Sequence, residues 1–138
     1  MKTTLIISTY NWSNALELVL KSVLFQTFTV DEVIIADDGS SEETKSLINT
    51  YSNLFSIPLK HVWHPDLGFR KTIILNKAYS CAIGEYIIQI DGDIILHPKF
   101  IQDHITNARK SQFIHGGRVL LKLNITLERL NNLNINFH

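Results

Sequence analysis

The feature that most constrains the fold is a repeated alternation between short apolar segments and segments with helical spacing. The strand-like segments are 5–7, 33–36, 59–64 and 86–90. The helix-like segments are 13–25, 40–51, 71–82 and 98–110. Strands that are apolar throughout suit a parallel sheet with both faces covered by helices. Because each strand is followed by a helix, the sequence predicts an α/β fold with a parallel sheet.

The last quarter of the chain fits this pattern less well. Residues 113–122 are expected to form a fifth strand, interrupted by Gly116 and Gly117. The tail over 126–138 has an Asn-rich, partly helical pattern and no closing element. We therefore expect residues 1–138 to be one domain that is truncated before its architecture closes.

Composition narrows the class of protein and its partners. Thirteen basic and thirteen acidic residues cancel, so there is no basic surplus of the kind that binds nucleic acid. Cys81 is the single cysteine and has no disulfide partner within the chain, which favours a reducing compartment. The sequence has no apolar run long enough to span a bilayer. We expect a cytoplasmic location, with the intact protein at the inner face of the membrane.

Polar residues follow each predicted strand. They are Thr9, Tyr10 and Asn11 after the first strand, Asp37 and Asp38 after the second, Asp66 and Arg70 after the third, and Asp91, Gly92 and Asp93 after the fourth. In an open parallel sheet, ligands bind beyond the carboxyl ends of the strands. The sequence therefore predicts that four strands deliver polar groups to one edge of the sheet.

The Asp91-Gly92-Asp93 run is the sharpest of these signals. Carboxylate oxygens suit hard cations such as Mg²⁺ or Mn²⁺, which keep coordination positions for substrate phosphates. Gly92 between them would let the backbone approach a bulky ligand closely. A simple turn with solvated aspartates is the alternative, and the strand-end position opposite Asp38 favours the metal site.

The other strand-end groups suit a nucleotide. The Asp38 carboxylate could accept a hydrogen bond from an imide N–H and so select uracil over cytosine. Tyr10 could stack on a base, and Arg70 with Lys71 could hold a diphosphate near a helix N-terminus. Ordinary loop, edge and surface roles remain open for each of them. The six histidines are interpreted as structural or surface residues, and Cys81 as part of the core.

The order of these motifs resembles the inverting family 2 glycosyltransferases of GT-A fold. The resemblance rests on the segments 6–11, 36–40, 66–76 and 84–93, in register over about residues 3–122. Within the family, the segment 66–76 is similar to the branch with chondroitin-polymerase-type, capsule and lipopolysaccharide transferases. The resemblance implies a three-layer α/β/α Rossmann-like fold with a mostly parallel sheet.

The same resemblance implies roles for individual residues. Thr9, Tyr10 and Asn11 would line the nucleoside pocket, Asp38 would bind uracil, and Arg70 and Asn76 would contact the donor. Asp91 and Gly92 would lie near the ribose, and Asp93, with Asp91, would hold Mn²⁺ or Mg²⁺. The implied reaction transfers a sugar from a UDP-sugar to a saccharide acceptor with inversion, as in the biosynthesis of bacterial surface polysaccharides.

Two departures from the family pattern shape what is expected of this chain. Leu75 stands where family members commonly carry Arg before the helix Asn, and no counterpart of the acidic catalytic base follows Asp93. We therefore expect the 138-residue polypeptide to bind its donor but to be inactive in isolation. We also expect an uncovered fifth strand to promote a homodimer.

Other functions remain open from the residues alone. The first is a non-catalytic nucleotide-binding or interaction module of the same fold. A haloacid-dehalogenase-type phosphotransferase is less consistent, because Asp91-Gly92-Asp93 follows the fourth strand and Ile95 replaces the usual Thr or Val. A sugar nucleotidyltransferase would need a Gly-rich, Arg-containing loop after the first strand, and a dinucleotide-binding domain would need Gly-x-Gly-x-x-Gly. The sequence has neither.

Overall fold

The computed structural model describes residues 1–136, which divide into two compact units. The first unit comprises Met1–Ser13 and Val30–Gly92, and the second comprises Asn14–Thr29 together with residues 93–136. All strands assigned within residues 1–136 belong to the first unit, whereas the second contains helices and connecting segments.

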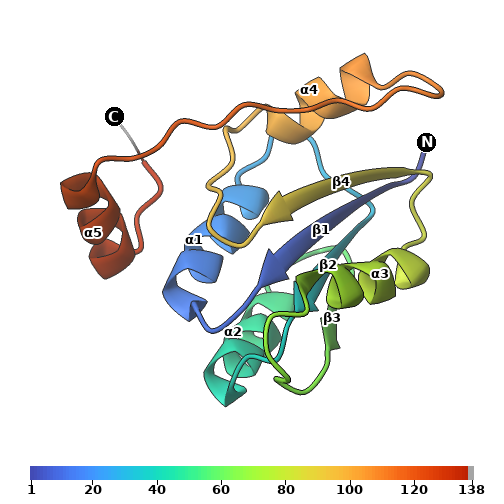
Figure 1. Ribbon diagram of the computed structural model, residues 1–138. Coiled ribbons are helices and arrows are strands. Elements are labelled where there is room, and N and C mark those ends of the chain that lie inside the picture. Colours follow the sequence, from blue (N-terminus) through green and yellow to red (C-terminus); the bar gives the residue numbers. More distant parts are fainter. Residues whose placement is uncertain (137–138) are drawn as a thin grey trace. The chain divides into compact units, whose positions relative to one another are not determined.

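The first unit is built on a four-stranded parallel sheet (Figure 1). Its strands are β1 (Thr3–Thr9), β2 (Glu32–Asp37), β3 (Leu59–Trp63) and β4 (Tyr86–Asp91). Their spatial order is β3-β2-β1-β4, so the chain adds strands on one side of β1 and then crosses to the other side. The register places Thr9 beside Asp37 and Ser8 beside Asp91. The strand order therefore reverses at β1, and the carboxyl ends of its neighbours flank the point where open α/β sheets bind ligands.

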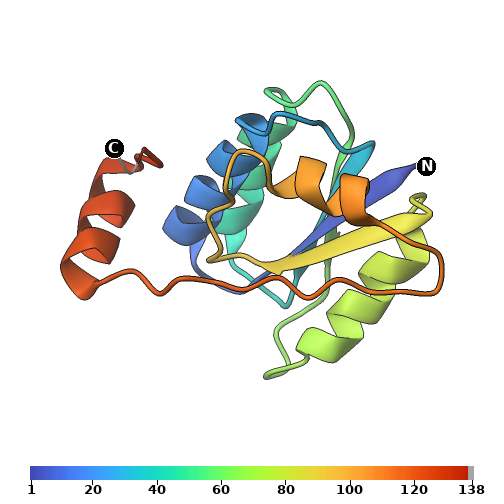
Figure 2. The same ribbon diagram turned by 90° about the horizontal axis from the view of Figure 1, so that it is seen from above.

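Two helices of the first unit cover opposite faces of this sheet. They are α2 (Glu42–Ser52) and α3 (Lys71–Cys81), and both views place them on different sides of the strands (Figures 1 and 2). Ile74 and Ala78 lie four residues apart on α3 and pack in a buried cluster with Ile6, Ile34 and Ala36. The predicted α/β fold, with a three-layer α/β/α arrangement around a parallel sheet, is confirmed.

The second unit contains α1 (Ser13–Leu24), whose first residue belongs to the first unit, with α4 (Phe100–Asn107) and α5 (Leu123–Asn132). The Gln26 side chain donates to the His97 carbonyl at 2.9 Å and accepts from the Ile101 amide at 3.1 Å. Ile101 is fully buried. These contacts fix the segment that precedes α4 against the residues that follow α1. No helix within residues 1–136 is long and apolar enough to cross a membrane.

The predicted fifth strand is wrong. Residues 113–122 are not in a strand, and the side chains of Phe113 and Val119 are each 90% exposed. A Cβ placed on Gly116 or Gly117 would meet no atom within 4 Å. A β-prone sequence becomes a strand only where a neighbouring strand supplies hydrogen-bond partners, and this segment has none within residues 1–136. The expected homodimer, which was argued from that strand, stays a prediction. The end of the tail expected over 126–138, including His138, lies outside the described residues.

The interpretation of Cys81 as part of the core is wrong. Cys81 is exposed, because it is the last residue of α3 and lies beyond Ala78, the last buried residue of that helix. Tertiary contacts also shape the ends of both helices. Ser40 Oγ accepts from the Asn11 amide at 2.8 Å, and α2 begins after Ser41. Gly84, after α3, packs so closely on β1 that a Cβ would lie 2.5 Å from the Thr4 nitrogen.

Candidate functional site

The loops at the carboxyl edge of the sheet are held in place by a buried carboxylate. Asp37 is fully buried at the end of β2. Its Oδ1 accepts from the Ser40 amide at 2.8 Å, and its Oδ2 lies 2.8 Å from His61 Nε2. Burial alone would raise the pKa of Asp37, but hydrogen bonds with His61 and Ser40 outweigh it and hold the pKa below its ordinary value. Asp37 therefore anchors the loop, while Asp38 beside it is the candidate for ligand recognition.

The loop after β1 is tied to the loop after β2. Asn11 has a φ of 43°, a left-handed conformation that Asn tolerates better than most residues. Its Oδ1 accepts from the Ser41 amide at 2.8 Å, just before α2 begins. The predicted role of Asn11 in a nucleoside pocket is untested, and the structure gives it a positioning role.

Tyr10 reaches a different loop. It is half exposed, and its hydroxyl donates to Asp66 Oδ2 at 2.7 Å. The same hydrogen bond raises the pKa of Tyr10 and lowers the pKa of Asp66. Thr9 is buried at the end of β1, and its carbonyl accepts from the Asp38 amide at 3.1 Å. Tyr10 is the aromatic residue among those predicted after the first strand, and its half-exposed ring is open to stacking on a base.

A glycine lets two of these loops touch. Gly39 has a φ of 95°, and a Cβ built on it would lie 2.6 Å from the backbone nitrogen of Asp66. A side chain at this position would therefore be strained by its backbone conformation and would also collide with the neighbouring loop.

We expect Gly39→Ala to lower the free energy of unfolding by roughly 2 kcal/mol or more, since a left-handed φ and a backbone collision are combined. Chemical denaturation would measure the loss. Gly68→Ala is the matched control, because Gly68 has a φ of 89° but no atom within 4 Å of its Cβ position. It should cost only the backbone strain, about 1 to 2 kcal/mol. Equal losses in the two variants would show that the loops do not need this close approach.

Asp38 lies at the centre of the carboxyl edge and is largely buried. Its Oδ1 is 2.5 Å from His64 Nε2, and its Oδ2 accepts from the Arg70 amide at 2.8 Å. The carboxylate therefore joins the end of β2 to the segment between β3 and α3. Each carboxylate oxygen can accept more than one hydrogen bond, so neither contact uses up its capacity to bind a ligand.

Asp91 ends β4 on the other side of β1. Its Oδ1 accepts from Lys71 Nζ at 2.5 Å and from Ser8 Oγ at 3.0 Å. Gly92 packs on β1, because a Cβ there would lie 2.6 Å from the Ser8 carbonyl oxygen. Close approach at Gly92 is thus required by the fold itself. Asp93 follows as the first residue of the second unit and is exposed.

The remaining residues predicted to contact the nucleotide are Arg70, just before α3, and Asn76, within α3. Within residues 1–136 the Arg70 guanidinium makes no hydrogen bond or ion pair, so it can meet an anion. Asn76 is exposed on α3, and no hydrogen bond joins it to another predicted site residue in this part of the chain. The structure thus brings Arg70 to Asp38 and leaves Asn76 apart.

The side chains at the carboxyl edge suit a divalent ion that needs only one or two protein ligands. No cluster of three or more His, Cys, Asp or Glu side chains that could enclose a metal occurs within residues 1–136. A Mg²⁺ or Mn²⁺ ion commonly takes one or two carboxylates and fills its shell with phosphate oxygens and water. The Asp91-Gly92-Asp93 run can supply that number, so the residues fit a metal that arrives with a phosphorylated ligand.

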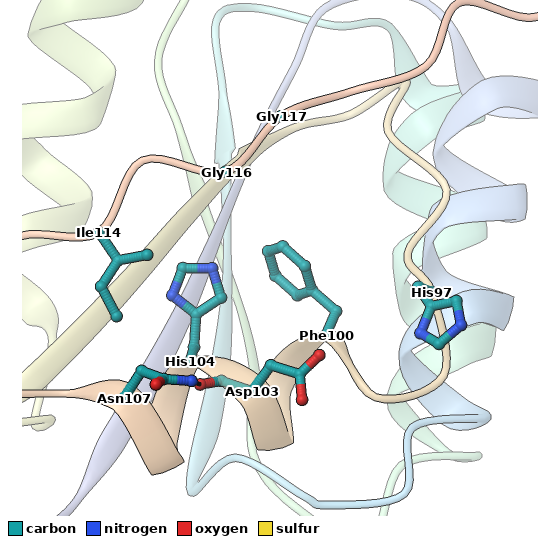
Figure 3. Close-up of a pocket in the computed structure, with 8 residues that line it drawn as sticks. All are labelled: His97, Phe100, Asp103, His104, Asn107, Ile114, Gly116 and Gly117. Carbon is teal, nitrogen blue, oxygen red and sulfur yellow. Dashed lines mark hydrogen bonds between the residues drawn. The ribbon is translucent and has the colours of Figure 1, made fainter.

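The second unit contains a separate hollow of about 320 Å³ (Figure 3). It is lined by His97, Phe100, Asp103, His104, Asn107, Ile114, Gly116 and Gly117. The Phe100 and His104 rings point into it, with centroids 4.6 Å apart. Burial lowers the pKa of His104, only partly opposed by the charge of Asp103. None of the residues predicted for the site lines this hollow.

The sequence did not reveal the partners of three side chains at the carboxyl edge. His61 and His64 were interpreted as structural or surface residues, but each contacts an aspartate of the second strand end. Lys71 was predicted to bind a diphosphate with Arg70, whereas it is paired with Asp91. The position of His64 directly after a strand could have suggested its place at the edge, but nothing local identifies its partner.

Known proteins match this chain over most of its length. The sequence model of a family described as "Glycosyl transferase family 2" matches residues 4–136. Chondroitin synthase of Escherichia coli is 29% identical over 103 residues, which cover 74% of this chain and 15% of that protein.

Solved structures show the same fold. A mannosyltransferase of Pyrobaculum calidifontis, determined with GDP-Man and Mn²⁺, has a TM-score of 0.68 at 23% identity and covers 75% of this chain and 31% of its own. Residues 1–349 of TarS of S. aureus, determined with UDP, have a TM-score of 0.63 at 26% identity, covering 77% of this chain and 31% of that one. The chain thus spans less than a third of the length of each of these three proteins.

Proposed function

The chain belongs to glycosyl transferase family 2, and from this we propose that residues 1–138 form the donor-binding part of a metal-dependent sugar transferase. Its donor would be a UDP-sugar and its acceptor a saccharide. Transfer would proceed with inversion, in the biosynthesis of a bacterial-type surface polysaccharide or lipopolysaccharide. The acceptor-binding part would lie outside these residues.

The observation that carries the proposal is the pair of carboxylates on either side of the carboxyl end of β1. Asp38 follows β2 and Asp91 ends β4, and β1 lies between these two strands. A base at Asp38 and a diphosphate near Asp91 would place a nucleotide across the point where the strand order reverses. Relatives support a nucleotide donor, since TarS was determined with UDP and the Pyrobaculum enzyme with GDP-Man.

Several residues of the first unit would bind the UDP-sugar donor. Asp38 would accept the uracil N3–H, with Tyr10 against the face of the base. The Arg70 guanidinium would bind the diphosphate, because its planar donors match phosphate oxygens. Thr9, Asn11 and Asn76 would complete the nucleoside side of the pocket.

The metal site would be formed by Asp93 together with Asp91, next to Gly92. A bound Mn²⁺ or Mg²⁺ ion would supply Lewis-acid neutralisation of the charge on the departing nucleoside diphosphate. Lys71, which is paired with Asp91 in the ligand-free chain, would contribute positive charge to the same phosphates.

We expect UDP to bind only with a divalent ion and to bind more tightly than CDP. Cytosine presents a lone pair at N3, so it would face the Asp38 carboxylate without a hydrogen bond. Calorimetry of UDP, CDP and GDP, with Mn²⁺ or with a chelator, would measure both effects. Equal affinity for UDP and CDP, tighter binding of GDP, or UDP binding in the chelator would count against the proposal.

A second candidate is a module that holds a nucleotide without chemistry, and donor hydrolysis separates the two. A donor-binding part should slowly release UDP from a UDP-sugar in the presence of Mn²⁺, because the leaving group is stabilised even without an acceptor. The module should release none. Comparison of UDP release by the wild type and by Asp93→Asn would show whether the release depends on the proposed metal site.

A further inference from the structure

Three side chains form a continuous polar chain behind the proposed base-binding position. Asp38 Oδ1 lies 2.5 Å from His64 Nε2, and His64 Nδ1 lies 3.3 Å from Lys77 Nζ. The His64 side chain is only 3% exposed, and that of Asp38 is 8% exposed. Asp38 and His64 must therefore be satisfied by neighbouring protein groups, whereas the third member, Lys77, is exposed.

The chemistry of lysine fixes the direction of these hydrogen bonds. A lysine ammonium group has donors and no acceptor, so in this contact His64 Nδ1 must be the acceptor. The proton of a neutral imidazole is then on Nε2, which donates to Asp38. Asp38 therefore receives donors on both oxygens, from His64 at Oδ1 and from the Arg70 amide at Oδ2.

This arrangement keeps Asp38 an acceptor. If His64 carried its proton on Nδ1, the Nε2 lone pair would face the Asp38 carboxylate, and two acceptors would repel each other at this distance. Asp38 would then lose the donor that fixes Oδ1. With the proton on Nε2, the carboxylate is held in place and can accept from the N3–H of uracil, which cytosine lacks.

We propose that His64 is a positioning residue for base recognition and that Lys77 holds it in the tautomer whose Nε2–H donates to the Asp38 carboxylate, which selects uracil. This rests on the proposed function, in which Asp38 contacts the base. Neither residue would touch the nucleotide. Their effect would be to fix the orientation and the acceptor character of one carboxylate.

The first test needs no nucleotide. In protein labelled with ¹⁵N at histidine, long-range ¹H–¹⁵N spectra at neutral pH should show His64 with a protonated Nε2 and an unprotonated Nδ1. In Lys77→Met the preference for this tautomer should weaken, because the donor to Nδ1 is removed. A protonated Nδ1 in the wild type would overturn the proposal.

The second test measures base preference by calorimetry in the presence of Mn²⁺. We expect His64→Phe to reduce the preference for UDP over CDP by about tenfold or more, since a hydrogen bond to a charged group is lost. His64→Gln should retain most of the preference, because its amide nitrogen can donate from a position similar to Nε2. Unchanged preference in His64→Phe would overturn the proposal. If His64→Phe does not fold, the preference for UDP over CDP is measured in Lys77→Met instead, because Lys77 is exposed. An unchanged preference in Lys77→Met would also overturn the proposal.

His61 provides the matched control. It contacts the neighbouring Asp37 through the same ring atom at 2.8 Å, but Asp37 is not assigned to the base. His61→Phe should lower stability and leave the UDP preference unchanged, whereas equal losses of preference in both variants would make the effect of His64 merely structural. A wild type that binds no uridine nucleotide would refute the proposed function, while the spectra would still report whether Lys77 sets the tautomer.

Discussion

Asp93→Asn should weaken Mn²⁺-dependent UDP binding by about tenfold to a hundredfold. Loss of a partner behind a metal ligand costs this much, and loss of charge on a proposed direct ligand should cost no less. Asparagine keeps an oxygen of similar position but cannot neutralise the ion. Calorimetric titration of UDP at fixed Mn²⁺ would measure the change, and the metal affinity seen in the presence of UDP should fall as well, because the two binding equilibria are linked.

The control for this variant is Asp103→Asn on α4, which makes the same chemical change outside the proposed metal site. It should bind UDP as the wild type does. Asp93 is exposed, so its replacement should leave the melting temperature without ligand unchanged. Equal UDP affinity in the two variants would show that Asp93 does not hold the metal.

Glu32→Ala should lower the free energy of unfolding by roughly 3 kcal/mol, because a fully buried carboxylate with several partners is removed. Glu32 accepts from Thr4 Oγ1 and from the Ile83 amide, each at 2.6 Å, and Lys60 Nζ lies 2.7 Å from its other oxygen. Without Glu32, the Ile83 amide loses its acceptor in a partly buried place. Denaturant titration would measure the loss.

The stability difference between the wild type and Glu32→Ala should depend on pH. Burial alone would raise the pKa of Glu32, but hydrogen bonds from Lys60, Thr4 and Ile83 outweigh it and hold the pKa below its ordinary value. A lowered pKa means that the stabilisation is present above the unfolded-state pKa of about 4.3 and is lost as the pH falls through the folded-state pKa. The stability gap between wild type and Glu32→Ala should therefore narrow in acid.

Glu42→Ala is the matched control for this substitution. The Glu42 side chain is 85% exposed, and its ion pair with Lys45 on α2 spans 3.8 Å. Surface ion pairs of this kind contribute little, so the change should stay within about 0.5 kcal/mol. A loss for Glu32→Ala no larger than that for Glu42→Ala would show that the buried carboxylate is not needed for stability.

The amino-acid pattern was sufficient to predict the four strands and the helices between them. Buried strands such as 33–36 are apolar throughout, and helix α3 carries Ile74 and Ala78 at the spacing of one helical face. These are local signals, because side-chain periodicity follows from the geometry of each element alone. The segment 113–122 has a similarly β-prone composition, yet it is not a strand, since pairing depends on a neighbour that the local sequence does not specify.

The polar residues at the carboxyl edge of the sheet follow from the sequence alone, because parallel strands that end at Asp37 and Asp91, with Asp38 directly after Asp37, deliver them to the same side. How these residues pair depends on the tertiary structure. His64 lies 26 residues from Asp38, and Lys71 lies 20 residues from Asp91. The strand order β3-β2-β1-β4 and the close contact at Gly39 bring such distant residues together, and neither is encoded in a pattern of neighbouring residues. The same physical reason explains why the sequence predicts a recognition role for Asp38 but does not identify His64 as its partner.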